Sequence, residues 1–173
     1  LLIADEVVTG FGRLGTMFGS DFYGIEPDII TIAKGLTSAY APLSGVIVSD
    51  KVWQVLVQGS DQLGAIGHGW TYAAHPICAA AGVANLEVID ELGLVDNAGS
   101  TGAYFRSELT KALAGHKHVG DVRGDGMLAA VEFVEDKDDR AFFDPGKKIG
   151  PQVAAALLER GVIGPAMPQG DIL

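Results

Sequence analysis

The sequence is poor in cysteine, in basic residues and in long apolar runs. Its single cysteine, Cys78, excludes an internal disulfide framework, and its place among small residues favours a buried, unreactive thiol. The 12 Lys and Arg are scattered among 22 Asp and Glu, so we expect no nucleic-acid partner. No apolar run approaches the ~20 residues that cross a bilayer, and no secretory signal is visible. We therefore expect no membrane partner and a cytoplasmic location.

The chain is nevertheless apolar enough to fold. Hydrophobic residues make up 48% of its 173 positions, sufficient for a sizeable core. The first residue is Leu1 rather than Met, and it lies inside an apolar run. We therefore expect a fragment of a longer enzyme that is inactive alone, so that functional expectations concern the parent enzyme.

The order of apolar patterns predicts an α/β region followed by a smaller α+β region. Short runs rich in branched residues predict strands of an α/β sheet buried on both faces, at 1–8, 28–35 and 43–49. Helical signals follow at 51–58, at 77–95 after Pro76, and at 97–113. An alternating strand at 127–134 and a helix near 151–161 indicate the second region. We expect domains at 1–115 and 116–173.

The first candidate site is a glycine pattern. Gly10, Gly12 and Gly15 spell G-x-G-x-x-G directly after an apolar run. A dinucleotide site also needs a helix that leaves this loop and meets the pyrophosphate at its N-terminus. Residues 16–28 lack helical apolar spacing, which disfavours a nicotinamide-dependent oxidoreductase but keeps it as an alternative.

The second candidate site is a pair of charged residues. Asp5 and Lys34 each follow an expected buried strand, and they are 29 residues apart, which leaves room for two neighbouring strands. Ligands bind at the carboxyl ends of strands in open α/β sheets, and burial there favours a neutral, nucleophilic lysine amine. Pyridoxal phosphate uses such a pair, a Schiff-base lysine and an acid against its ring nitrogen. The alternative is a turn-capping aspartate and a solvated lysine.

Three motifs favour the cofactor. The segments D-E-V-V-T-G-F-G-R-L-G, I-A-K-G-L and H-G-W-T-Y-A-A-H-P occur in this order. Together they resemble the class III pyridoxal-phosphate aminotransferases of fold type I, over nearly the whole chain. The resemblance implies that Asp5 pairs with the pyridine nitrogen, Val7 packs on the ring, Lys34 forms the Schiff base, and Thr71 binds the phosphate across a dimer interface. His116 and His118 flank Lys117 without acids or cysteines beside them, so we expect no metal site.

The resemblance also implies an activity and an assembly. A primary amine or omega-amino acid would donate its amino group to a keto acid such as pyruvate in a ping-pong cycle, since the third motif looks closest to the amine:pyruvate branch. An aminomutase or a decarboxylating transaminase of the same class is the alternative. Residues 1–115 would be part of the large domain, with connector helices, and 116–173 a truncated small C-terminal domain. The active site shared between subunits implies a homodimer, with a tetramer left open.

Two further charged residues have structural interpretations. We expect Arg123 to form a salt bridge at the junction of the two domains. Glu132 alternates with apolar residues, so we expect it on the exposed face of its strand.

Overall fold

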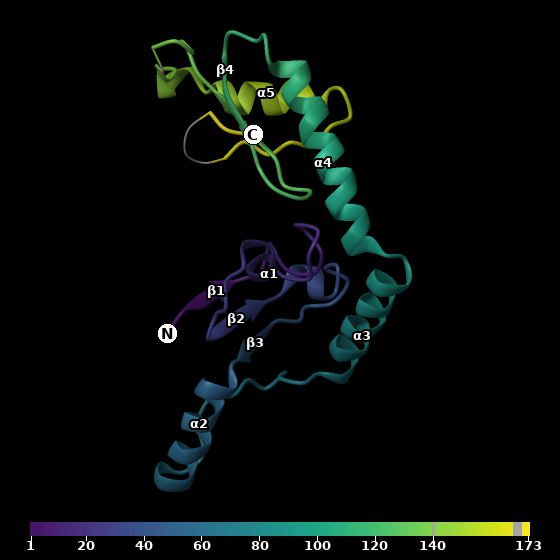
Figure 1. The fold of residues 1–173 in the computed structure, drawn as a ribbon, viewed down its shortest axis with the longest axis vertical. Coiled ribbons are helices and arrows are strands. Elements are labelled where there is room, and N and C mark those ends of the chain that lie inside the picture. Colours follow the sequence, from purple (N-terminus) through teal and green to yellow (C-terminus); the bar gives the residue numbers. More distant parts are fainter. Residues whose placement is uncertain (140, 168–170) are drawn as a thin grey trace. The chain divides into compact units, whose positions relative to one another are not determined.

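The computed structural model describes residues 1–139, 141–167 and 171–173. Contacts divide the chain into two compact units, Leu1–Ser100 and Thr101–Leu173. Figure 1 shows their elements. The domain boundary at residues 115 and 116 concerns the parent enzyme and stays a prediction.

The first unit is built on a three-stranded sheet. Its elements are β1 (Ile3–Asp5), α1 (Gly19–Tyr23), β2 (Ile29–Ile32), the 3-10 turn η1 (Lys34–Leu36), β3 (Gly45–Val48), α2 (Asp50–Leu63), α3 (Pro76–Glu91) and the start of α4 (Leu94–Leu113). The strand order is β1-β2-β3. Strands β1 and β2 run parallel, with Asp5 opposite Thr31, and β3 returns antiparallel with Gly45 opposite Ile32. The three predicted strands and the following helices are thus confirmed, with shorter strands than the apolar runs suggested.

Local sequence explains where the helices of this unit begin and end. Pro76 occupies the first turn of α3, as predicted, because its fixed φ suits that position and its missing N–H is not needed there. Gly93, with φ +58°, lies between α3 and α4, where the left-handed backbone ends the first of the two helices. Asp50 lies in the first turn of α2, where its negative charge interacts favourably with the positive end of the helix dipole.

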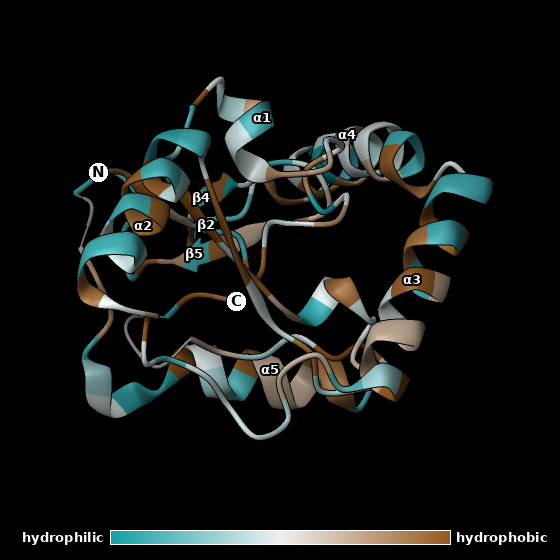
Figure 2. Ribbon diagram, turned by 90° about the horizontal axis from the view of Figure 1, so that it is seen from below, coloured by the Kyte–Doolittle hydropathy of each residue, from teal (hydrophilic) through white to brown (hydrophobic). Residues whose placement is uncertain are grey.

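The expectation of a sheet buried on both faces is wrong for this chain. The side chains of Ile3 and Val46 are 60% and 64% exposed. The physical reason is that the helices of this unit do not cover the strands: α2 buries none of its residues, and α3 buries only Gly82 and Ile89. Apolar residues also remain exposed on α3, whose turns carry brown segments in Figure 2.

Helix α1 was not expected, and it forms because of Glu6. The Glu6 side chain is only 2% exposed. Its carboxylate accepts hydrogen bonds from the backbone N–H groups of Gly19, 2.8 Å away, and Ser20, 2.6 Å away. These are helix N-terminal donors that otherwise lack partners. A carboxylate from 13 residues earlier therefore anchors a five-residue helix that has no apolar periodicity of its own.

The second unit pairs an antiparallel hairpin with helices. It contains the rest of α4, β4 (Val119–Arg123), β5 (Ala130–Phe133), the 3-10 turn η2 (Pro145–Lys147) and α5 (Ile149–Leu158). Strand β5 falls within its predicted segment and helix α5 overlaps the predicted one, beginning two residues earlier, whereas β4 was not predicted. Arg123 Nη1 contacts Asp121 at 2.8 Å and Glu132 at 2.5 Å, so its ion pairs lie within the hairpin rather than at a domain junction. Glu132 is half-buried rather than fully exposed.

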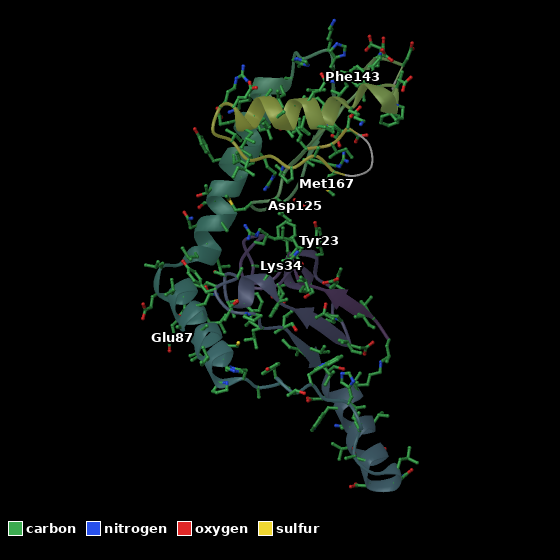
Figure 3. The ribbon with its side chains drawn as sticks, turned by 180° about the vertical axis from the view of Figure 1, so that it is seen from behind. Tyr23, Lys34, Glu87, Asp125, Phe143 and Met167 are labelled. Carbon is green, nitrogen blue, oxygen red and sulfur yellow. The ribbon has the colours of Figure 1, made fainter. Side chains whose placement is uncertain are left out.

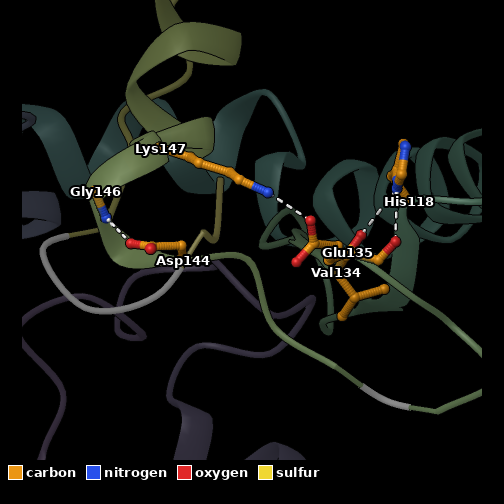
Figure 4. A network of polar contacts seen from close by, with 6 residues as sticks. All are labelled: His118, Val134, Glu135, Asp144, Gly146 and Lys147. Atoms are coloured by element: carbon orange, nitrogen blue, oxygen red, sulfur yellow. Dashed lines mark hydrogen bonds and ion pairs between the residues drawn. The ribbon is translucent and has the colours of Figure 1, made fainter.

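A polar network joins the end of this hairpin to η2 (Figure 4). The His118 ring nitrogen Nδ1 lies 3.2 Å from the carbonyl oxygen of Val134 and 3.1 Å from that of Glu135. The Lys147 ammonium contacts the Glu135 carboxylate at 2.5 Å. His118 therefore binds backbone carbonyls, which is a structural role.

Among the helices that the structure describes, none combines the length and apolar character needed to span a membrane.

Candidate active site

The site begins with Asp5, the last residue of β1. Its carboxylate oxygen Oδ1 accepts two hydrogen bonds of 3.1 Å, from the Val7 backbone N–H and from the Thr31 hydroxyl. Oxygen Oδ2 has no hydrogen-bond partner among the described residues. One oxygen therefore holds the side chain in place, and the other is available to a bound group.

Lys34 lies two residues after the end of β2, at the first position of η1 (Figure 3). Its backbone φ is +42°, in the left-handed region that a residue with a side chain rarely adopts. Its side chain is exposed, which corrects the expectation that it is buried. The reason is the open sheet described above. In the described part of the chain, the Lys34 ammonium has no hydrogen-bond or ion-pair partner.

The parallel pairing of β1 and β2 brings these two residues to one edge of the sheet. Asp5 is the register partner of Thr31, and Lys34 follows Thr31 by three residues. Carboxyl ends of parallel strands meet at the same edge, where ligands bind in open α/β sheets. The predicted geometry of neighbouring strands ending in an acid and an amine is therefore confirmed.

The other two predicted site residues lie differently. Val7 is half-buried, and its backbone N–H is one of the two groups that hold Asp5. Thr71 is exposed in the segment between α2 and α3. It lies in a turn that is closed by a hydrogen bond from the Ala73 N–H to the Trp70 carbonyl oxygen. No hydrogen bond among the described residues joins Thr71 to Asp5 or Lys34. The chain thus brings three of the four residues to one strand edge.

The glycine pattern packs against this edge. A Cβ placed on Gly35 would lie 3.3 Å from the carbonyl oxygen of Gly10 and 3.2 Å from Cβ of Phe11. The loop that contains Gly10 therefore lies directly beside the residue that follows Lys34. The next helix, α1, has its N-terminal amides occupied by Glu6, so they are not available to a pyrophosphate. These contacts give the glycines a packing role and remove the basis of the dinucleotide interpretation.

Sequence reasoning missed three residues around the site. Thr31 holds Asp5, Glu6 anchors α1, and Asn85 on α3 binds the turn that carries Lys34. An isolated asparagine inside the Ala-rich stretch of α3 was a usable signal, because asparagine favours caps and turns over helix interiors. Thr31 gave no such signal, since threonine is common in strands.

Comparison with known proteins places these residues in a family. The family model described as Aminotransferase class-III matches residues 1–169. The diaminobutyrate–2-oxoglutarate transaminase of Halomonas elongata is 61% identical over 173 residues, which are the whole of this chain and 37% of that protein. The chain thus spans little more than a third of the length of this curated relative.

Solved structures agree with that match. A transaminase obtained by ancestral reconstruction superimposes with a TM-score of 0.99 at 61% identity, covering 100% of this chain and 38% of its own. The omega transaminase of Pseudomonas jessenii, in complex with PMP, gives a TM-score of 0.93 at 40% identity, covering 99% of this chain and 38% of its own.

Proposed function

Because the chain belongs to the class III aminotransferases, a family of pyridoxal-phosphate-dependent enzymes, we propose that its full-length protein transfers an amino group from a primary amine or omega-amino acid to a keto acid such as pyruvate. The observation that carries this proposal is the placement of Asp5 and Lys34 at the ends of adjacent parallel strands. The name of the Halomonas relative adds diaminobutyrate and 2-oxoglutarate as the first alternative pair of substrates.

The residues present fit the cofactor. Asp5 offers the unpartnered oxygen Oδ2 on a carboxylate whose other oxygen is fixed, and Lys34 offers an exposed, unpartnered amine. In this proposal Asp5 holds the ring nitrogen, Val7 packs on the ring, Lys34 binds the cofactor covalently, and Thr71 binds the phosphate of the partner subunit's site. When bound, pyridoxal phosphate supplies a ring that takes up the electron pair of a breaking C–H bond.

Lys34 then has a second task as a general base. Once the substrate amine has displaced it, the Nζ amine takes the proton from the substrate carbon that bears the amino group. In the second half-reaction it returns a proton to the corresponding carbon of the keto acid. Because the first substrate would leave its amino group on the cofactor and depart as a carbonyl product before the second substrate binds, we expect ping-pong kinetics. Asp5, held by Thr31 and the Val7 N–H, keeps one carboxylate orientation throughout.

The proposed assembly extends beyond this chain. Thr71 takes no part in the hydrogen bonds around Asp5, and we propose that it binds the cofactor phosphate in the active site of the other subunit of a homodimer. We assign residues 1–115 to part of the large domain and 116–173 to a small C-terminal domain. Support for a separate small domain comes from the compact second unit, with its own hairpin and α5. A cytoplasmic location completes the proposal.

The experiment uses the full-length protein loaded with pyridoxal phosphate. Borohydride reduction followed by peptide mass spectrometry identifies which lysine carries the pyridoxyl group. We expect the label on Lys34 and none on Lys51, a lysine that pairs instead with Asp28 at 3.0 Å. A folded protein labelled elsewhere, or not at all, would refute the assignment.

Substrate assays then separate the remaining activities. Pyruvate and 2-oxoglutarate are each offered with diaminobutyrate and with a simple primary amine, and the amino acid products are measured. Transfer to either keto acid supports the proposal and identifies the acceptor. Carbon dioxide release, or amino transfer within one molecule, would indicate the decarboxylating transaminase or the aminomutase.

A further inference from the structure

Asn85 makes an unusual set of contacts for a residue in the middle of a helix. It lies on α3, half-buried, and its Nδ2 donates to the carbonyl oxygens of Gly35, 2.8 Å away, and Leu36, 3.2 Å away. Its Oδ1 accepts from the Ser38 hydroxyl at 2.7 Å. These partners are 47 to 50 residues away in sequence, and all belong to the segment that begins at Lys34.

That segment needs to be held, because three of its residues have a left-handed backbone. Lys34 has φ +42°, Ser38 +49° and Ala39 +62°. Residues with a Cβ persist in this region only where the surroundings over-determine the conformation. Helix α3 supplies such surroundings, since it packs against η1 and its Asn85 satisfies two carbonyls that point toward it.

The turn also determines the direction in which Lys34 leaves the backbone. The Lys34 carbonyl accepts backbone hydrogen bonds from Thr37, 3.2 Å away, and Ala39, 3.3 Å away. The peptide plane of Lys34 is therefore part of the turn that Asn85 holds. A rotation of this turn would move the start of the lysine side chain relative to Asp5, which is fixed separately by Thr31.

We propose that Asn85 is a positioning residue for Lys34: it clamps the left-handed turn after β2 and so fixes where the lysine amine emerges beside Asp5. The effect of Asn85 on the reaction rests on the proposed function, whereas the effect of Asn85 on the conformation of the turn does not. The donors of the amide are essential to the clamp. An aspartate of the same shape would keep the acceptor for Ser38 but would turn a carboxylate oxygen toward the carbonyls of Gly35 and Leu36.

The test compares three variants of the full-length protein. Asn85→Asp removes both donors, and Ser38→Ala removes only the bond to Oδ1. Glu87→Gln is the matched control, because Glu87 is exposed on the same helix and points outward (Figure 3). Two quantities are measured. The first is hydrogen exchange of the 36–40 amides in the cofactor-free protein, and the second is the rate at which added pyridoxal phosphate becomes fixed on Lys34, read by borohydride trapping and peptide mass.

We expect Asn85→Asp to raise exchange at 36–40 and to slow capture at Lys34, each on the order of tenfold, as for the loss of hydrogen bonds to two part-buried carbonyls. Ser38→Ala should give a smaller change of the same kind, and Glu87→Gln none. Exchange in β1 and β2 should stay as in the wild type, which separates a local effect from general destabilisation. If Asn85→Asp does not fold, Ser38→Ala takes its place, because it also removes a bond between Asn85 and the turn; unchanged exchange at 36–40 in that variant would then overturn the clamp.

Two results would overturn the proposal. One is unchanged exchange at 36–40 when the donors are removed. The other is a loosened turn with an unchanged capture rate, because Asn85 would then be structural only. If the wild type captures nothing on Lys34, the proposed function fails and the chemical role of Asn85 fails with it. The exchange measurement still decides separately whether Asn85 holds the turn.

Discussion

The Thr31 hydroxyl donates a hydrogen bond to Oδ1 of Asp5 across the β1–β2 pair, with 3.1 Å between the two oxygens. The two residues are register partners, so the contact follows directly from the parallel pairing. Because the Val7 N–H uses the same oxygen, Oδ2 is left for a bound group. Thr31 thereby determines the orientation of the carboxylate that the proposed function places against the cofactor ring.

Replacing Thr31 tests this relationship. Thr31→Val keeps the shape and strand propensity of the side chain but removes the donor, so we expect the cofactor Kd to rise about tenfold, the effect of one hydrogen bond to a charged group. Thr31→Ser retains the hydroxyl and should bind as the wild type does. Equilibrium dialysis of the full-length protein with pyridoxal phosphate measures both. Equal affinity in all three proteins would show that Asp5 needs no support from Thr31.

The sheet edge could be predicted because its signals are local. Asp5 and Lys34 directly follow apolar runs bounded by Pro or Gly, and two such runs with a short connection favour neighbouring strands. The residues that support this edge could not be predicted in the same way. Asn85 and Ser38 are 47 residues apart in sequence and meet only when α3 packs against the turn.

The two missed elements have the same physical origin. Strand β4 includes Gly120, Asp121 and Arg123, which do not favour a strand, and it forms by pairing with β5 and by the ion pairs of Arg123. Helix α1 forms on the carboxylate of Glu6. In both cases tertiary contacts override a weak local preference. The predicted burial of the sheet was too high for a different reason. Apolar strands indicate that some layer of structure covers them, but the pattern does not show which part of the protein supplies that layer.

Glu6 should be a stability residue rather than a catalytic one. Glu6→Gln places an NH₂ group where Gly19, Ser20 or Thr9 donates. We expect a loss of about 2–3 kcal/mol in the free energy of unfolding, because buried donors lose a charged acceptor. Urea unfolding of the cofactor-free full-length protein measures it. The control Glu26→Gln, at an exposed position, should be near neutral; equal stability of the two variants would contradict the anchoring role.

The same carboxylate predicts a pH dependence. Burial raises the pKa of Glu6, but the hydrogen bonds from Thr9, Ser20 and Gly19 outweigh it and leave the pKa below the ordinary value of 4.5. The stabilisation is therefore complete above pH 4.5 and is lost as the pH falls through the folded-state pKa. The stability gap between wild type and Glu6→Gln should narrow on acidification, as urea titrations at stepped pH would show. A constant gap would exclude this linkage.

The left-handed backbone of Lys34 predicts which of two inactive variants is the more stable. Lys34→Ala and Lys34→Gly both remove the amine, so both should lose amino transfer. Glycine adopts φ +42° without the Cβ penalty, and the exposed lysine side chain contributes little packing. Lys34→Gly should therefore be more stable than Lys34→Ala by about 0.5–1 kcal/mol in urea unfolding, which is the Cβ penalty less the greater conformational entropy that glycine loses on folding. The reverse order would mean that the turn relaxes when the lysine is removed.

Gly102 in α4 provides a test of packing within the second unit. A Cβ there would overlap the carbonyl oxygen and carbon of Gly126, so the 124–126 turn must move away from the helix. That movement also disturbs the hydrogen bond from Arg106 to the same carbonyl. We expect Gly102→Ala to cost about 3 kcal/mol or more in urea unfolding. Gly115→Ala, with nothing within 4 Å of the added Cβ, should stay within about 0.5 kcal/mol of the wild type. If both variants unfold like the wild type, the close approach of α4 to this turn does not contribute to stability.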